Sequence, residues 1–177
     1  MNFFNNFFGS KKIDIEEISK SVLQTMNVAE SSVILYESLK SVKINLDPRY
    51  DRIITAYIYG LVDLYNTAHG VKKILSDTEL NNHYKEMTTF CIIQNHVYKL
   101  KDKEKYLKSQ TDDHQKKIDE KISFFKSNIG PEDFQTVANK GYDFGKFFYQ
   151  NNGEIIGTPF AFDLPKILDD PNINFDK

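Results

Sequence analysis

Tryptophan is absent from this sequence of 177 residues, and cysteine occurs once, as Cys91. A single cysteine excludes an intramolecular disulfide and a zinc site built from cysteine thiolates. Cys91 lies in an apolar stretch between Phe90 and Ile92. We therefore expect it to be a small buried core residue and not a nucleophile.

Arginine is almost as scarce, since Arg49 and Arg52 are the only two. Proteins that bind nucleic acids usually present a strongly basic surface and use arginine to contact bases and phosphates. The formal net charge of this chain is −2. We therefore expect no nucleic-acid partner.

Long apolar runs are also lacking. The longest, from Ile53 to Tyr65, is interrupted by Asp63 and is shorter than the roughly 20 residues that a membrane-spanning helix needs. The first residues lack the basic start and the continuous apolar stretch of a signal peptide. From these absences we expect a soluble, cytoplasmic protein.

What the sequence does contain is a series of apolar stripes with helical spacing of three and four residues. They predict an all-α fold, a single-domain bundle of about six helices over residues 13–150. A Phe-rich segment (1–12) precedes the bundle, and an acidic tail that contains Pro and Asn (151–177) packs on it or extends from it. The predicted helices are 13–27, 28–44 with fraying near Lys43, 47–70, a helix from 76 whose apolar pattern fades between Lys99 and Lys108, a helix after a turn at 110–113, and 131–150.

Local signals define the expected helix ends, with an acceptor side chain at several starts and glycine or proline at several stops. They are Asp14 with Glu17, Asp47 with Pro48, Gly70, Ser76 with Glu79, and Gly130 with Pro131. Small residues also recur at helical spacing, namely Ala56 and Gly60 in one helix and Gly141 and Gly145 in another. This spacing predicts that neighbouring helix backbones approach closely at these positions.

Two loop motifs are approximated but incomplete. Residues 141–147 have one spacer too few for a phosphate-binding loop, and Phe147 stands where that loop has a hydroxyl. In the tail, acidic and amide residues alternate from Asp170, as in a calcium-binding loop, but Phe175 occupies the position that needs glycine. We interpret the first segment as a packing face and the second as a surface tail.

Metal binding in the bundle is not indicated either. Glu79, His83 and Glu86 share one side of a helix, but no Glu-x-x-His pair is present to complete a di-metal site. A Glu/His group on a single helix is more typical of a solvated face. We therefore expect no metal, no cofactor and no catalytic residue.

The four phenylalanines near the start of the chain are the main candidate for an interaction site. If this segment is helical, Phe3, Phe4, Phe7 and Phe8 fall on one side of it. Leaving them in water would forfeit about 1.5–3 kcal/mol for each side chain. A groove of the same domain, a second subunit, a partner protein or a membrane surface are the possible covers.

The central predicted helix supplies a candidate pocket, formed by Tyr50, Tyr57 and Tyr65 with Asp63 nearby. Our leading hypothesis is a non-enzymatic cytosolic protein that acts through protein–protein interaction, as an adaptor, regulator or inhibitor, with a protein partner or as a homodimer. The alternative is a small-molecule-binding bundle or enzyme with a tyrosine-lined pocket. A third possibility is peripheral membrane association through the Phe cluster.

Overall fold

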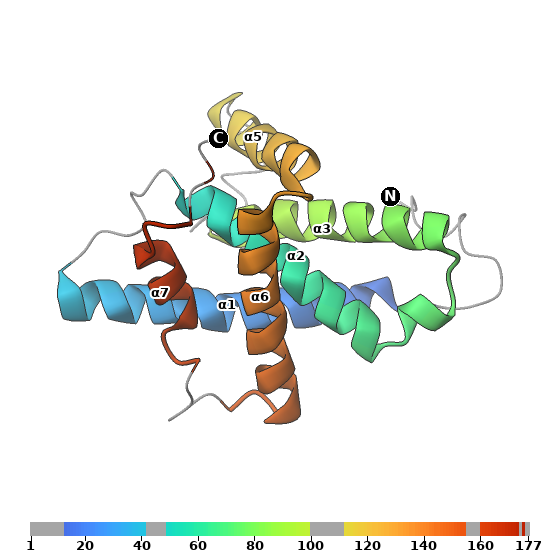
Figure 1. Cartoon of the computed structure of the whole chain (residues 1–177), viewed down its shortest axis with the longest axis horizontal. Helices are drawn as coiled ribbons and strands as arrows, with labels where there is room; N and C mark the ends of the chain where they lie inside the picture. The colour runs from blue at the N-terminus through green and yellow to red at the C-terminus, as the bar shows by residue number, and fades with distance from the viewer. Residues whose placement is uncertain (1–12, 42–48, 100–111, 155–159, 174, 176–177) are drawn as a thin grey trace.

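Six α-helices and one short 3₁₀ turn make up the regular structure of the computed structural model, which describes residues 13–41, 49–99, 112–154, 160–173 and 175. No strand occurs among these residues, so the expected all-α fold with about six helices is confirmed. The elements, labelled in Figure 1, are α1 (Ile15–Lys40), α2 (Tyr50–Ala68), the 3₁₀ turn η2 (Val71–Lys73), α3 (Asp77–Lys99), α5 (Asp112–Asn128), α6 (Glu132–Gln150) and α7 (Asp163–Asp169).

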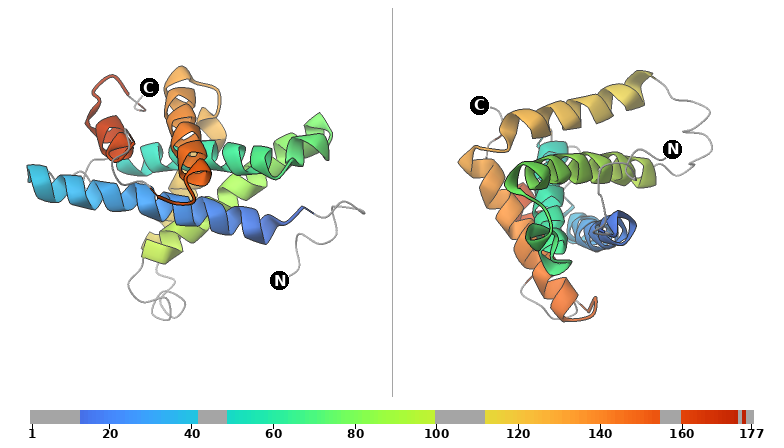
Figure 2. Two further views of the ribbon diagram at one scale, coloured as in Figure 1. Left: turned by 90° about the horizontal axis from the view of Figure 1, so that it is seen from below. Right: turned by 90° about the vertical axis from the view of Figure 1, so that its right-hand side faces the viewer.

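Helix α2 is the centre of the fold. It contacts α1, α3, α5, α6 and α7, and the two views of Figure 2 show the other helices arranged around it. Buried side chains consequently occur on most of its circumference, as the wide apolar surface of this segment predicts. They include Ile53, Ile54, Ala56, Tyr57, Ile58, Leu61, Val62, Leu64 and Tyr65.

Helices α2 and α6 cross in close contact (Figure 1), at the positions where small residues recur in both segments. A Cβ atom at Gly60 would lie 1.8 Å from the backbone oxygen of Ala138, and one at Gly141 would lie 2.4 Å from the backbone oxygen of Tyr57. Either distance is far inside van der Waals contact. The two backbones can therefore touch here only because both positions are glycine, as the small-residue spacing predicts.

Several predicted caps are present. The Asp14 side chain accepts a hydrogen bond from the backbone N–H of Glu17 at 2.9 Å, and the backbone N–H of Ser76 donates to the Glu79 carboxylate at 3.0 Å. Gly70 adopts the left-handed conformation after α2, with φ of 68°. Asp47 and Pro48 lie outside the described residues.

The division of the first region into two helices is wrong, because α1 is continuous from Ile15 to Lys40. Its buried stripe runs on through Met26, Ala29 and Val33, so nothing in the packing favours a break near residue 27. Ser41 then ends the helix in a left-handed conformation, with φ of 56°. The predicted turn at 110–113 is also wrong at Asp112 and Asp113, which belong to the first turn of α5.

Helix α7 is an element that the sequence interpretation missed. Its side chains Leu164, Ile167 and Leu168 are buried against the bundle, and Ile173 and Phe175 after it are buried as well. The interpretation of the residues after Asp170 as a simple surface tail is therefore wrong for these two positions. Local propensity gave little sign of α7, because a seven-residue helix depends on tertiary packing.

Both arginines of the chain hold this C-terminal region. The Arg49 guanidinium donates hydrogen bonds to the backbone oxygens of Leu168, Asp170 and Ile173 at 2.7, 2.8 and 3.0 Å. Arg52 donates to the backbone oxygen of Phe175 at 2.9 Å. The planar fork of arginine suits several acceptors at once, which a lysine at the same position would not satisfy.

The α2–α6 contact gives a direct test of the fold. We expect Gly60→Ala to lower the free energy of unfolding by about 1–3 kcal/mol, because the added methyl group forces the two backbones apart. Gly130→Ala is the matched control, since a Cβ there meets no atom within 4 Å. Urea unfolding of the two variants measures the difference. Equal stability of both would contradict the close approach.

Candidate functional site

The predicted interaction residues Phe3, Phe4, Phe7 and Phe8 lie outside the described residues. Their role therefore stays a prediction. Cys91 is completely buried, as expected for a core residue. Burial raises the pKa of its thiol to about 12, so the thiol is protonated at neutral pH and is a poor nucleophile.

Two of the predicted pocket residues are buried in different parts of the core. Tyr57 packs its ring 6.1 Å from that of Phe144, and burial, followed by the charge of Asp163, raises its pKa well above the usual value. The Tyr65 hydroxyl lies 2.6 Å from the hydroxyl of Thr25 on α1. The Tyr65 ring also lies 6.1 Å from that of Tyr149 on α6. The two tyrosines thus have different side-chain partners.

The other two predicted residues are also separated. Asp63 accepts a hydrogen bond from the Tyr84 hydroxyl at 2.6 Å and forms an ion pair with Lys72 at 3.0 Å. Tyr50, at the start of α2, is the one of the four that lines the cleft described next. The structure does not gather the four around one contact, and the tyrosine-lined pocket stays a prediction.

A cleft of about 630 Å³ lies where α1, α2, α3 and α5 meet, and we call it the four-helix cleft. Most of its lining residues are of polar type, and several of them are charged. The lining residues are Asn27, Glu30, Ser31 and Ile34 from α1, Tyr50 and Asp51 from α2, His96 and Lys99 from α3, and Lys117 and Lys121 from α5.

Glu30 holds one side of the cleft together. Although it is only 8% exposed, its carboxylate receives three donors, the Tyr50 hydroxyl at 2.5 Å, the Asn95 amide at 2.9 Å and the Lys99 ammonium at 2.5 Å. Burial, and then the negative charge of Glu30, raise the pKa of Tyr50 above its usual value. The phenol therefore stays protonated and donates to the carboxylate.

Lys121 holds the other side and is also only 8% exposed. Its ammonium nitrogen lies 2.8 Å from Oδ1 of Asp51 and 3.3 Å from Nδ1 of His96. Burial lowers the pKa of Lys121, while the Asp51 carboxylate acts in the opposite direction. The close carboxylate favours the ammonium form of this lysine, which is a donor to both neighbours.

These contacts determine the state of the His96 ring. An ammonium group can only donate, so Nδ1 of His96 must accept and the ring proton of the neutral imidazole resides on Nε2. Burial, and then the charge of Lys121, lower the pKa of His96 to about 4. Within the described part of the chain, Nε2 is buried and has no hydrogen-bond partner. The ring of His114 lies 5.8 Å away, measured between ring centroids.

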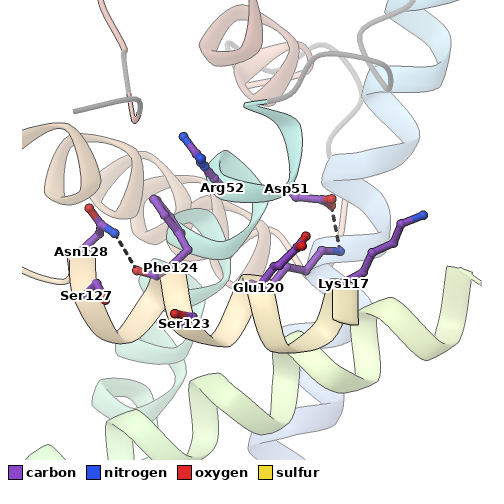
Figure 3. Close-up of a pocket in the computed structure, with 9 residues that line it drawn as sticks. Asp51, Arg52, Lys117, Glu120, Ser123, Phe124, Ser127 and Asn128 are labelled. Atoms are coloured by element: carbon purple, nitrogen blue, oxygen red, sulfur yellow. Dashed lines mark hydrogen bonds and ion pairs between the residues drawn. The ribbon is translucent and has the colours of Figure 1, made fainter. Parts of the chain in front are cut away.

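A second cleft, of about 490 Å³, lies along the other side of α5 (Figure 3). It shares Asp51, Lys117 and Lys121 with the four-helix cleft, and Arg52 and Phe124 also contribute to its wall. Asp51 and Lys121, which form the ion pair described above, both line this cleft as well. This ion pair therefore borders both clefts.

The sequence interpretation missed Glu30, His96 and Lys121. A usable signal existed for two of them, because each is a charged residue at a position of an apolar stripe. Glu30 lies three residues before buried Val33, and Lys121 lies between buried Ile118 and Phe125 at spacings of three and four. A buried charge at such a position needs a partner, although the sequence does not say which one.

The state of His96 leads to a prediction about pH. Its pKa is lower in the folded chain than the value of about 6.5 in an unfolded one. As the pH falls from about 6.5 towards 4, the unfolded chain therefore binds the proton first and the folded state loses stability. We expect His96→Gln to reduce this loss, measured by urea unfolding at a series of pH values. Equal pH dependence in both proteins would contradict the assignment.

No group of three or more metal-binding side chains was found in the described ranges, and none of the helices in that part of the chain is both long and apolar enough to cross a membrane. No model of a known protein family matches the chain, and no curated protein or solved structure shows significant similarity to it.

Proposed function

We propose that this chain is a helical binding protein whose site is the four-helix cleft and whose ligand is a small polar molecule. The observation that carries the proposal is the cleft itself, whose lining includes Glu30, Asp51, Lys99 and Lys121, charged side chains that are paired with one another. A volume of about 630 Å³ falls within the range of small-molecule sites, which is about 300–1,000 Å³.

Preorganisation of the wall supports binding. Glu30 fixes the Tyr50 hydroxyl and the Lys99 ammonium, and Asp51 fixes the Lys121 ammonium. A ligand that enters the cleft does not have to order these groups, so less binding free energy is lost on association. A site on four helices is also more rigid than one on loops.

The cost of the buried charges also supports a functional role. Lys121 is buried while its partner Asp51 is half exposed. Removing the Lys121 ammonium group from water costs desolvation free energy, and a well-packed apolar residue often gives equal or greater stability. Ionisable groups with shifted pKa values in a cleft are typical of functional sites. Both His96 and Lys121 are such groups.

The cleft can be blocked without disturbing the buried contacts. Ser31 is exposed, lines the cleft and bonds the backbone oxygen four residues earlier, at Asn27. We expect Ser31→Trp to fill the cleft and abolish stabilisation by a small polar ligand. The wild type should gain about 2.7 kcal/mol at a ligand concentration of 100 Kd. A thermal-shift screen with a library of polar metabolites, followed by titration, measures both effects.

Ser38→Trp is the matched control for this experiment. Ser38 is also exposed on α1 and makes the same type of bond, to the backbone oxygen of Ile34. It does not belong to the lining of the cleft. Ligand stabilisation should survive in this variant. Equal loss in both variants, or no stabilising compound in the library, would contradict the proposal.

A second candidate function follows from one exposed face of α1. This face carries no charged residue, and three of its large apolar side chains are 62%, 53% and 68% exposed. Its members are Ser31, Ile34, Leu35, Ser38 and Leu39. Figure 1 shows the C-terminal end of α1 extending past α7. Because an uncharged face does not repel its own copy, we infer that it pairs with α1 of a second chain.

Self-association predicts a mass that depends on concentration. We expect Leu35→Glu to keep the chain monomeric, since two like charges would then meet at the contact. Analytical ultracentrifugation between about 1 and 500 µM measures the effect. Gln24→Glu adds the same charge near the middle of α1 and should leave association unchanged. A wild type that stays monomeric throughout would contradict this second candidate.

A further inference from the structure

We propose that the four-helix cleft recognises an anionic oxygen, in a carboxylate or phosphate group of its ligand, through the Nε2–H group of His96. This inference rests on the proposed binding function and specifies its chemistry.

The direction of the donor is determined by a chain of three side chains. Asp51 accepts from Lys121, and Lys121 donates to Nδ1 of His96. Nε2 is consequently the atom of the neutral ring that carries a proton. His96 is 9% exposed and lines the cleft, while its Nε2 atom is buried and has no acceptor among the described residues. A ligand oxygen therefore reaches this atom when the ring turns towards the cleft. A buried donor without an acceptor is destabilising, and a ligand oxygen would remove that cost.

The charges of the cleft favour an anion as the source of that oxygen. Its lining has three lysines, Lys99, Lys117 and Lys121, and two acids, Glu30 and Asp51, an excess of one positive charge. Both acids are already bound to lysines. A metal ion or organic cation would instead meet a proton donor and three ammonium groups.

Lys117 is the lysine that can move towards a bound anion. Its ion pair with Asp113 is 3.4 Å long, and the side chains are 51% and 70% exposed. Exposed pairs of this kind contribute little free energy, so exchanging Asp113 for a ligand costs little. Lys99 is held more firmly by Glu30 and contributes its charge from a defined position.

The first experiment determines the tautomer of the His96 ring directly. Two-dimensional ¹H–¹⁵N spectra of the histidine side chains report which nitrogen carries the proton. We expect the Nε2–H form for His96 in the free protein. Its Nε2 signal should move on titration with sodium acetate, succinate or inorganic phosphate at constant ionic strength. Acetamide and succinamide are the uncharged controls and should cause at least tenfold weaker effects.

A substitution then tests whether His96 itself makes the contact. His96→Phe keeps a ring but removes the donor, and anion affinity should fall at least tenfold. Lys117→Met, on the exposed side of the cleft, should weaken binding about two- to fivefold and leave the His96 tautomer unchanged. Should His96→Phe fail to fold, the wild-type spectra and Lys117→Met still decide the question.

The outcomes distinguish a carboxylate from a phosphate ligand, and anion recognition by His96 from ligand binding in the cleft as such. Response to acetate and succinate alone assigns a carboxylate, and response to phosphate alone assigns a phosphate group. An Nδ1–H tautomer, or a His96 signal that no anion moves, overturns this inference. If uncharged polar compounds still stabilise the protein in that case, the proposed binding function survives without it. Absence of stabilisation by any compound overturns both.

Discussion

The contact between the backbones of α2 and α6 is the constraint on which the rest of the structure depends. Gly60 and Gly141 each lie against a backbone carbonyl of the opposite helix, so the two helices cross in backbone contact and leave no room for a side chain at either position. Since α2 is surrounded by α1, α3, α5, α6 and α7, fixing its position also fixes what those helices can pack against. Gly145 extends the contact to the side chains of Leu61 and Leu64, where α2 continues past the crossing.

The start of α2 connects this packing to the four-helix cleft on one side and to the C-terminal region around α7 on the other. Tyr50 and Asp51 reach into the four-helix cleft, while Arg49 and Arg52 bind the backbone around and after α7. Adjacent residues of one helical turn point in different directions, so a single turn serves both tasks. A shift of α2 would therefore disturb the C-terminal region and the cleft together. The charges of the cleft are positioned by the same core contact that stabilises the fold.

Local signals in the sequence predicted much of the fold and little of the site. The caps at Asp14 and Ser76 and the glycine spacing depend on neighbouring residues, and these expectations are confirmed. The continuity of α1 and the existence of α7 depend on burial by distant helices, so they could not be read from local pattern. The cleft depends even more on residues that are far apart in the sequence. Lys121 contacts Asp51, and Glu30 contacts Asn95, only once the chain has folded.

The buried charges raise the question of what they contribute, and the position of Lys121 answers part of it. Its neighbours on the same stripe, Ile118 and Phe125, are buried, so a leucine at this position would continue the core without any desolvation cost. Lysine there requires the Asp51 carboxylate, and a second N–H group of the same ammonium constrains His96. The Asp51 carboxylate offsets the cost of burying Lys121, and Lys121 in turn donates to Nδ1 of His96. The series of contacts ends at this ring, which lines the cleft. Core stability alone gives no reason for this series, whereas recognition of a ligand oxygen does.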